Sequence, residues 1–168
     1  MKVLFLDVDG VLNCTYTFQR TYERWKETGA ATKGPEFAWP MGHLDDALVP
    51  NLNPIVEQTG CKIVLSSSWR VIAKIPDFRN WVSQKGFKYP EAIIDRTRSS
   101  VGDDPDGRGN EIKDWLTAHP EVTAYVILDD DSQDIVRVHP NNFVNTNGNE
   151  GLTDEKVQAA IAVLKKVS

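Results

Sequence analysis

Apolar runs that end abruptly in polar residues recur along this chain. The first run is Lys2-Val3-Leu4-Phe5-Leu6, and it leads directly into Asp7-Val8-Asp9-Gly10. An apolar run of this length that ends at a turn signal is typical of a buried strand. Runs with a similar pattern predict further strands over residues 61–65, 92–94, 122–128 and 142–145.

Segments with helix start and stop signals separate these predicted strands. Asn53-Pro54 predicts the start of a short helix, and Gly60 predicts its end. The other predicted helices run from Asp77 as a cap to Gly86, from Gly109 to Pro120, and onward from Thr153. Strands that alternate with helices predict an α/β fold, with a parallel sheet covered by helices on both faces.

Residues 15–43 differ in character from the rest of the chain. Aromatic residues fall at helical spacing here, and basic residues surround them: Phe18, Tyr22 and Trp25, with Arg20, Arg24 and Lys26. Gly29 is expected to end this helix. We expect a flap or small cap inserted into a single domain that covers residues 1–168. The aromatic stripe has two interpretations, internal packing or contact with a ligand, and the sequence favours neither.

The composition limits the class of protein. The chain has 168 residues, 40% of them hydrophobic, and five Trp, which is typical of a folded domain with a sizeable core. A net charge of −5 disfavours non-specific binding to nucleic acid, although it leaves room for a local basic pocket. Cys14 and Cys61 have no metal-binding spacing, and we expect both to be small buried residues. With no signal peptide and no run of membrane-spanning length, we expect a cytoplasmic protein without a membrane partner. No obligate protein partner is evident.

Three of the predicted strands end in groups that can bind ions. These groups are Asp7 and Asp9, Ser66 to Ser68, and Asp129 to Asp131. In an open α/β sheet the ligand site lies beyond the carboxyl ends of the strands, so we expect these groups at one edge. Carboxylates gathered there repel one another. A hard cation such as Mg²⁺, which takes oxygen ligands, would relieve that repulsion.

Such a cluster suits the transfer of a phosphoryl group. With a metal bound, one aspartate could attack phosphorus as a nucleophile, and a second could give a proton to the leaving oxygen and later activate water. Ser66 and nearby backbone N–H groups could hold phosphate oxygens. Arg108, at the start of a predicted helix, could add positive charge where transition-state charge spreads. Arg70 follows Ser66 closely in the chain, and its position indicates that its partner is either a phosphate or a carboxylate.

Four motifs, in this order, resemble the haloacid dehalogenase (HAD) superfamily of phosphotransferases. They are Asp7-Val8-Asp9-Gly10-Val11-Leu12-Asn13, Ser66 after a hydrophobic strand, Arg108 beside a helix start, and Ile127-Leu128-Asp129-Asp130 followed by Asp134. The resemblance implies a Rossmann-like, three-layer α/β/α fold with a mainly parallel sheet and a small cap. It also implies a phosphoric monoester hydrolase.

The resemblance implies a role for each acidic residue of these motifs. Asp7 would be the nucleophile that forms an aspartyl-phosphate, and also a Mg²⁺ ligand. Asp9 would be the general acid and base, and its backbone carbonyl would bind the metal. Asp130 would bind Mg²⁺ directly, with Asp129 and Asp134 arranged around it.

The resemblance further implies how the substrate is held. Ser66 would bind the transferring phosphoryl group. Arg108 stands where the family usually has a lysine, and arginine keeps the charge in a bulkier, forked group. We expect Ser67, Arg70 and Gly10 to contact the substrate.

Three shorter stretches resemble the HAD domain of Swiss-army-knife RNA-repair proteins. They are Ser66-Ser67-Ser68-Trp69-Arg70, Arg108-Gly109-Asn110-Glu111-Ile112 and Gly151-Leu152-Thr153. The Asp129-Asp130 pair is similar to the phosphatase domain of polynucleotide kinase-phosphatases. These likenesses imply removal of a terminal phosphate from a nucleotide or a polynucleotide end.

Two alternatives stay open. One is a phosphatase of small metabolites such as sugar phosphates. The other is a non-catalytic binding module that keeps only the fold, although the joint presence of Asp7, Asp9, Ser66 and Asp130 speaks against it.

Overall fold

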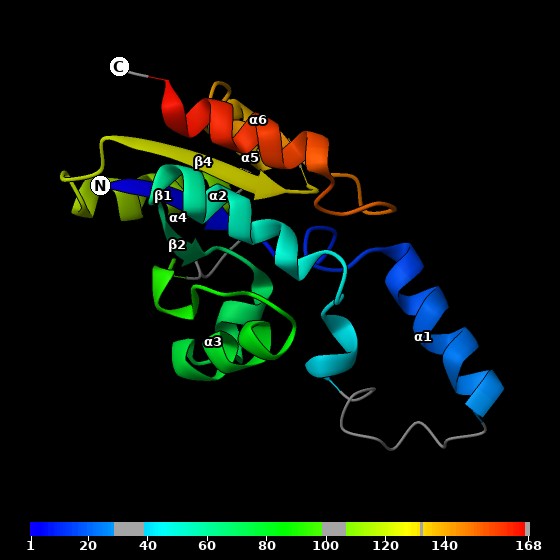
Figure 1. The fold of residues 1–168 in the computed structure, drawn as a ribbon. Coiled ribbons are helices and arrows are strands. Elements are labelled where there is room, and N and C mark those ends of the chain that lie inside the picture. Colours follow the sequence, from blue (N-terminus) through cyan, green and yellow to red (C-terminus); the bar gives the residue numbers. More distant parts are fainter. Residues whose placement is uncertain (29–38, 99–106, 132, 167–168) are drawn as a thin grey trace.

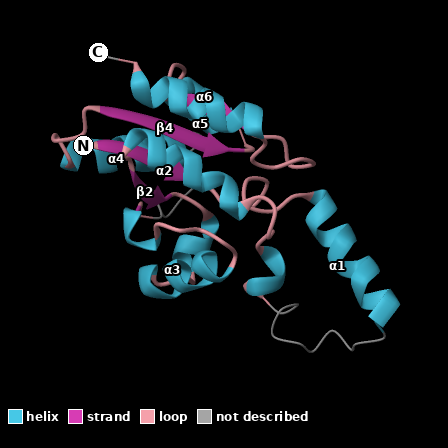
Figure 2. Cartoon of the chain, viewed as in Figure 1, coloured by secondary structure: helices cyan, strands magenta, loops and turns pink. Residues whose placement is uncertain are grey.

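The computed structural model describes residues 1–28, 39–98, 107–131 and 133–166. Within these residues, the strands form one parallel sheet in the order β3-β2-β1-β4-β5 (Figure 1, Figure 2). The strands are β1 (Lys2–Leu6), β2 (Lys62–Leu65), β3 (Ile93–Arg96), β4 (Ala124–Asp129) and β5 (Phe143–Asn145). The predicted α/β fold with a parallel sheet is confirmed.

Helices cover both faces of the sheet and complete three layers. The helices are α1 (Thr15–Thr28), α2 (Asn53–Thr59), α3 (Ile75–Gln84), α4 (Gly107–Ala118), α5 (Gln133–Val138) and α6 (Asp154–Lys165). On one face, side chains of α2, α3 and α6 pack with the strand residues Leu4 and Leu6. On the other, Val3 and Phe5 pack with side chains of α4 and α5. Because β1 is buried on both faces, its sequence is continuously apolar and does not alternate.

The predicted element boundaries are confirmed in part. Helix α2 ends at Gly60, which has a φ of +65° and donates its N–H to the Val56 carbonyl. Thr153 precedes α6, as predicted. The prediction that Asp77 caps α3 is wrong, because the helix begins at Ile75 with Pro76 in its first turn, where no N–H is needed. Asp77 lies inside that turn.

Two helices on the other face differ from the sequence prediction. Helix α4 begins at Gly107, so Arg108 lies within its first turn and not before it. Helix α5 was not predicted. It has only 6 residues, too few for a helical period to stand out, and Ile135 is its buried residue.

Helix α1 lies at the periphery, apart from the sheet (Figure 1). Phe18 and Tyr22 are exposed on it, which excludes core packing as the reason for these two members of the aromatic stripe, and Tyr16, which is outside the stripe, is exposed as well. Gly29 and the side chain of Trp25 lie outside the described residues, and the flap over residues 15–43 and the single domain stay predictions. Cys14 and Cys61 are both buried, as expected. None of the described helices has the length and apolar character needed to cross a membrane.

Candidate active site

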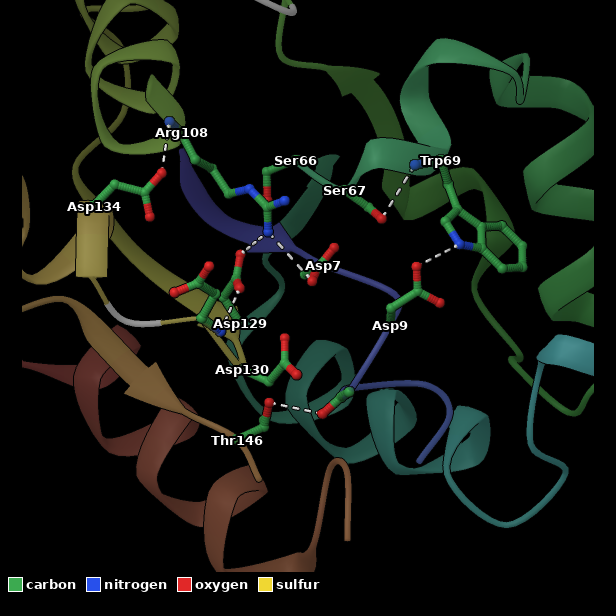
Figure 3. A network of polar contacts seen from close by, with 12 residues as sticks. Asp7, Asp9, Ser66, Ser67, Trp69, Arg108, Asp129, Asp130, Asp134 and Thr146 are labelled. Atoms are coloured by element: carbon green, nitrogen blue, oxygen red, sulfur yellow. Dashed lines mark hydrogen bonds and ion pairs between the residues drawn. The ribbon is translucent and has the colours of Figure 1, made fainter. Parts of the chain in front are cut away.

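The carboxyl ends of β1, β2 and β4 bring their polar residues together at one edge of the sheet (Figure 3). The Asp7 N–H donates to the Leu128 carbonyl at 3.0 Å, and the Ser66 N–H donates to the Leu6 carbonyl at 2.9 Å. These two bonds continue the sheet ladders one step past the strands. They fix Asp7 and Ser66 beside Asp129, the last residue of β4.

Three carboxylates form a cluster at this edge. One oxygen from each of Asp7, Asp129 and Asp130 lies within 4.8 Å of the others. Asp7 and Asp129 are buried, whereas Asp130 is exposed. Burial, with the charge of Asp7, raises the pKa of Asp129 to about 7, and burial also raises the pKa of Asp7 and Asp130. The protein therefore holds negative charges together at a cost, as a site for a cation does.

The Arg108 guanidinium bridges two of these carboxylates. Its Nη1 lies 3.3 Å from Asp7 Oδ2 and 2.5 Å from Asp129 Oδ2. Burial lowers the pKa of Arg108, but the charges of Asp7 and Asp129 more than offset this and raise it overall. The backbone N–H of Arg108 donates to Asp134 Oδ2 at 3.2 Å. Asp134 thus lies outside the carboxylate cluster and supports the first turn of α4.

Gly10 allows the close approach of Asp130 to the β1 end. Its φ is +69°, a left-handed conformation that favours glycine, and a Cβ built on it would lie 2.2 Å from Asp130 Oδ2. Thr146 Oγ1 donates to the Gly10 carbonyl at 2.8 Å and holds this turn in place. Thr146 is a residue of this site that was not predicted from the sequence. It directly follows the predicted strand over residues 142–145, so the pattern of polar residues after strands was the signal.

Asp9 points away from the cluster, although it is only two residues from Asp7. Its Oδ2 accepts a hydrogen bond from Trp69 Nε1 at 3.1 Å, and its Oδ1 accepts one from Asn13 Nδ2 at 2.9 Å. Asn13 Oδ1 in turn accepts the Gly10 N–H at 3.0 Å. Asn13 lies inside the first motif, but no role was predicted for it from the sequence.

The serine loop after β2 faces the cluster. Ser66 and Ser67 are fully buried, and within the described chain the Ser66 hydroxyl has no hydrogen-bond partner. Ser67 Oγ accepts the Trp69 N–H at 3.3 Å, and a hydrogen bond to Asp7 from the Ser67 side chain helps to lower the pKa of Asp7 against the effect of burial. An unpaired buried hydroxyl costs free energy, and a ligand oxygen at this place would satisfy it.

Arg70 lies behind the serine loop and has the carboxylate partner that the sequence allowed. Its Nη2 lies 2.5 Å from Glu111 Oε2 of α4, and its Nη1 donates to the Ser66 carbonyl at 2.6 Å. Both side chains are buried. Arg70 therefore braces the loop that carries Ser66 against the helix that carries Arg108, and its contact with substrate stays a prediction.

The donor set at this edge fits a divalent metal. Its members are carboxylate oxygens, which hard cations prefer. A bound cation would reduce the repulsion between these carboxylates and lower the raised pKa of Asp129. Any side chain at position 10 would occupy the space that the Asp130 carboxylate fills, so the turn leaves room for that carboxylate only because residue 10 is glycine.

Comparison with protein families gives one match. The model of the HAD domain in Swiss Army Knife RNA repair proteins matches residues 3–157. Comparisons with the curated proteins and with the solved structures found no significant match.

Proposed function

The chain belongs to the family of HAD domains in Swiss Army Knife RNA repair proteins, and from this premise we propose that it is a Mg²⁺-dependent phosphomonoesterase acting through an aspartyl-phosphate. The family indicates a hydrolase of the phosphatase type with a divalent metal. One observation carries the finer proposal: Asp7 lies in a carboxylate cluster with Arg108 Nη1 3.3 Å from its oxygen. The proposed substrate is a nucleotide or the terminal phosphate of a polynucleotide.

Asp7 is the proposed nucleophile. One of its oxygens attacks the phosphorus, the bond from phosphorus to the leaving oxygen breaks, and an aspartyl-phosphate forms. Arg108 supports this step because its positive charge favours the ionised carboxylate, which burial alone disfavours.

Asp9 is the proposed proton carrier. Its carboxyl group gives a proton to the leaving oxygen as the first bond breaks, and it then takes a proton from a water molecule. That water attacks the phosphorus, the bond to Asp7 breaks, and inorganic phosphate leaves. The Trp69 and Asn13 hydrogen bonds hold Asp9 in one orientation for both transfers.

Ser66 and Arg108 hold the phosphoryl group. The unpaired Ser66 hydroxyl donates to one of its oxygens, and the Arg108 guanidinium offers charge where the transition state spreads it. Asp7, Asp130 and the Asp9 carbonyl would bind Mg²⁺, which supplies further positive charge to the phosphoryl oxygens. Asp129 holds Arg108 at its guanidinium, and Asp134 holds it at its backbone N–H.

A screen with an aryl phosphate tests the proposal. We expect hydrolysis with Mg²⁺ and its loss with a chelator. Asp7→Asn should remove activity, whereas Asp114→Asn, which changes an exposed carboxylate of α4, should leave it unchanged. Activity that survives in Asp7→Asn would contradict the mechanism. Nucleoside monophosphates, 3′- and 5′-phosphorylated oligonucleotides and sugar phosphates then separate the substrate classes.

A further inference from the structure

An exposed tryptophan lies next to the candidate site. The Trp39 side chain is 43% exposed, a large fraction for an indole that also has aromatic neighbours. Its ring centroid lies 5.3 Å from that of Trp69 and 5.5 Å from that of Trp81. Trp39 therefore contacts two other indoles, while a large part of its own side chain is open to solvent.

The supporting indole also contacts the proposed proton carrier. Trp69 is 4% exposed and donates its Nε1–H to Asp9 Oδ2 at 3.1 Å. Its backbone N–H is held by Ser67 Oγ, and its ring packs on Phe78 of α3 with centroids 6.4 Å apart. Two adjoining indoles thus lead from the Asp9 carboxylate to the molecular surface, and the inner one is fixed.

The position of Asp9 determines which part of a substrate lies near these rings. Asp9 gives its proton to the leaving oxygen, so the alcohol part of the ester lies on the Asp9 side. If that alcohol is a nucleoside, its base extends toward the aromatic surface beyond Asp9. An indole held by neighbouring rings can contact a base at little cost in side-chain entropy, since those rings already limit its rotamers.

Resting on the proposed function, we propose that Trp39 stacks on the base of the leaving nucleoside and selects nucleotides over other phosphate esters. Every base has a π-face, so this contact accepts any sequence and requires a base that is not already paired and stacked. Stacking also suits a chain with a net charge of −5, because it does not depend on a broad basic surface. Trp39 then determines specificity, while Asp7 and Asp9 carry the chemistry.

Matched substrates with and without a base test this proposal. Adenosine 5′-monophosphate is paired with ribose 5-phosphate, and adenosine 3′-monophosphate with ribose 3-phosphate, since each pair shares the ester and differs in the base. Stacking contributes about 1–3 kcal/mol per base, which is roughly a 5- to 150-fold difference. We expect Trp39→Leu to lower the kcat/KM ratio of nucleotide to ribose phosphate by about that factor, mainly through KM. Trp39→Phe should lower it less.

Two controls separate stacking from a structural role. Tyr16→Leu removes another exposed aromatic residue, 54% exposed on α1, and should leave both substrates of a pair unchanged. The thermal midpoint of each variant reports on folding, and Trp39→Phe keeps the test open if Trp39→Leu does not fold. An equal change on both substrates of a pair, or no change in the ratio, would overturn the role of Trp39.

The outcome also distinguishes this proposal from the proposed function. A wild-type protein that hydrolyses both substrates of a pair, with no effect of Trp39 on their ratio, keeps the phosphatase and refutes the stacking contact. A wild-type protein that hydrolyses the aryl phosphate with Mg²⁺ but none of the four substrates refutes the stacking contact, and one that hydrolyses none of these, the aryl phosphate included, refutes the proposed function itself. Binding of adenosine 5′-monophosphate to Asp7→Asn, measured by calorimetry, is the second readout, and it should weaken in Asp7→Asn/Trp39→Leu.

Discussion

The buried ion pair between Arg70 and Glu111 makes a prediction that a mutant cycle can test. Arg70 Nη2 lies 2.5 Å from Glu111 Oε2, and its Nη1 donates to the Ser66 carbonyl at 2.6 Å. The two side chains are only 8% and 7% exposed. Removing one partner takes away the opposite charge that the other lies against, while that other charge stays buried, and replacing both removes the charges together. The single variants should therefore cost more stability than the double variant.

The magnitudes follow from the contacts. Breaking a buried ion pair from one side costs about 3–5 kcal/mol, so Glu111→Leu should lose about that much. Arg70→Met should lose more, since it also leaves the Ser66 carbonyl without its donor, at about 1–3 kcal/mol. In Arg70→Met/Glu111→Leu the buried carboxylate that faced Arg70 is gone as well, whereas the cost at the Ser66 carbonyl stays. We expect the double variant to recover about 2 kcal/mol or more relative to Arg70→Met.

Urea unfolding followed by circular dichroism measures these free energies, provided that the slopes with denaturant agree among variants. The pair of Lys85 and Asp46 is the control: their charged atoms lie 2.7 Å apart and the Asp46 side chain is 72% exposed, so Asp46→Ala should cost less than about 1 kcal/mol. Hydrolysis adds a second readout. Stability should recover in the double variant, whereas activity should not, because the Ser66 carbonyl is still unsupported. Costs that simply add in the double variant would refute the reasoning.

Three further predictions concern the turn at Gly10, the Arg108 guanidinium and the buried His139. Gly10→Ala and Gly60→Ala both place a side chain at positive φ, +69° and +65°, and each should lose about 1–2 kcal/mol of stability. Gly10→Ala should also lose Mg²⁺-dependent hydrolysis, because its Cβ would displace Asp130. A Cβ on Gly60 would meet no described atom within 4 Å beyond its chain neighbours, so Gly60→Ala should keep its activity. Equal activities of the two variants would contradict this role of Gly10. Arg108→Met should lower kcat about 10²- to 10³-fold in steady-state assays, whereas Arg108→Lys, which restores the charge, should recover most of it; a methionine variant as active as the lysine variant would exclude an electrostatic role. Burial lowers the pKa of His139 below its usual value near 6.5, so the folded state favours the neutral ring. The contribution of His139 to stability is therefore full above about pH 6.5 and falls as the pH drops through the lowered pKa. The difference in unfolding free energy between the wild type and His139→Gln, measured in urea, should narrow at acidic pH, and a constant difference would contradict this prediction.

The sheet and its carboxyl edge could be predicted from the sequence because β1, β2 and β4 are buried on both faces. Such strands are continuously apolar, and the first polar residue at the end of each one marks the edge: Asp7 and Ser66 directly after β1 and β2, and Asp129 as the last residue of β4. The α3 start was mistaken because an aspartate resembles a cap wherever a helix follows, and only Pro76 indicated an earlier start.

Tertiary partners could not be predicted in the same way. The sequence indicated that Arg70 needs a phosphate or a carboxylate, and nothing local identifies Glu111, which another helix brings to it. The same holds for Asp134. The resemblance placed it around the metal, and in the fold its carboxylate accepts the N–H of Arg108, because α5 packs closely against α4 at Gly109.

The different environments of Asp7 and Asp9 follow from the turn between them. Residues two apart in a strand share a face, so an extended chain would direct both carboxylates to one side. The strand ends at Leu6, however, and the N–H groups of Val11 and Leu12 donate to the Val8 carbonyl, which turns the chain out of the sheet. Asp7 keeps its ladder bond and faces Arg108, whereas Asp9 faces the donors of Trp69 and Asn13. Two carboxylates in separate environments can take separate chemical roles, and here a single turn is sufficient to separate the proposed nucleophile from the proposed proton carrier.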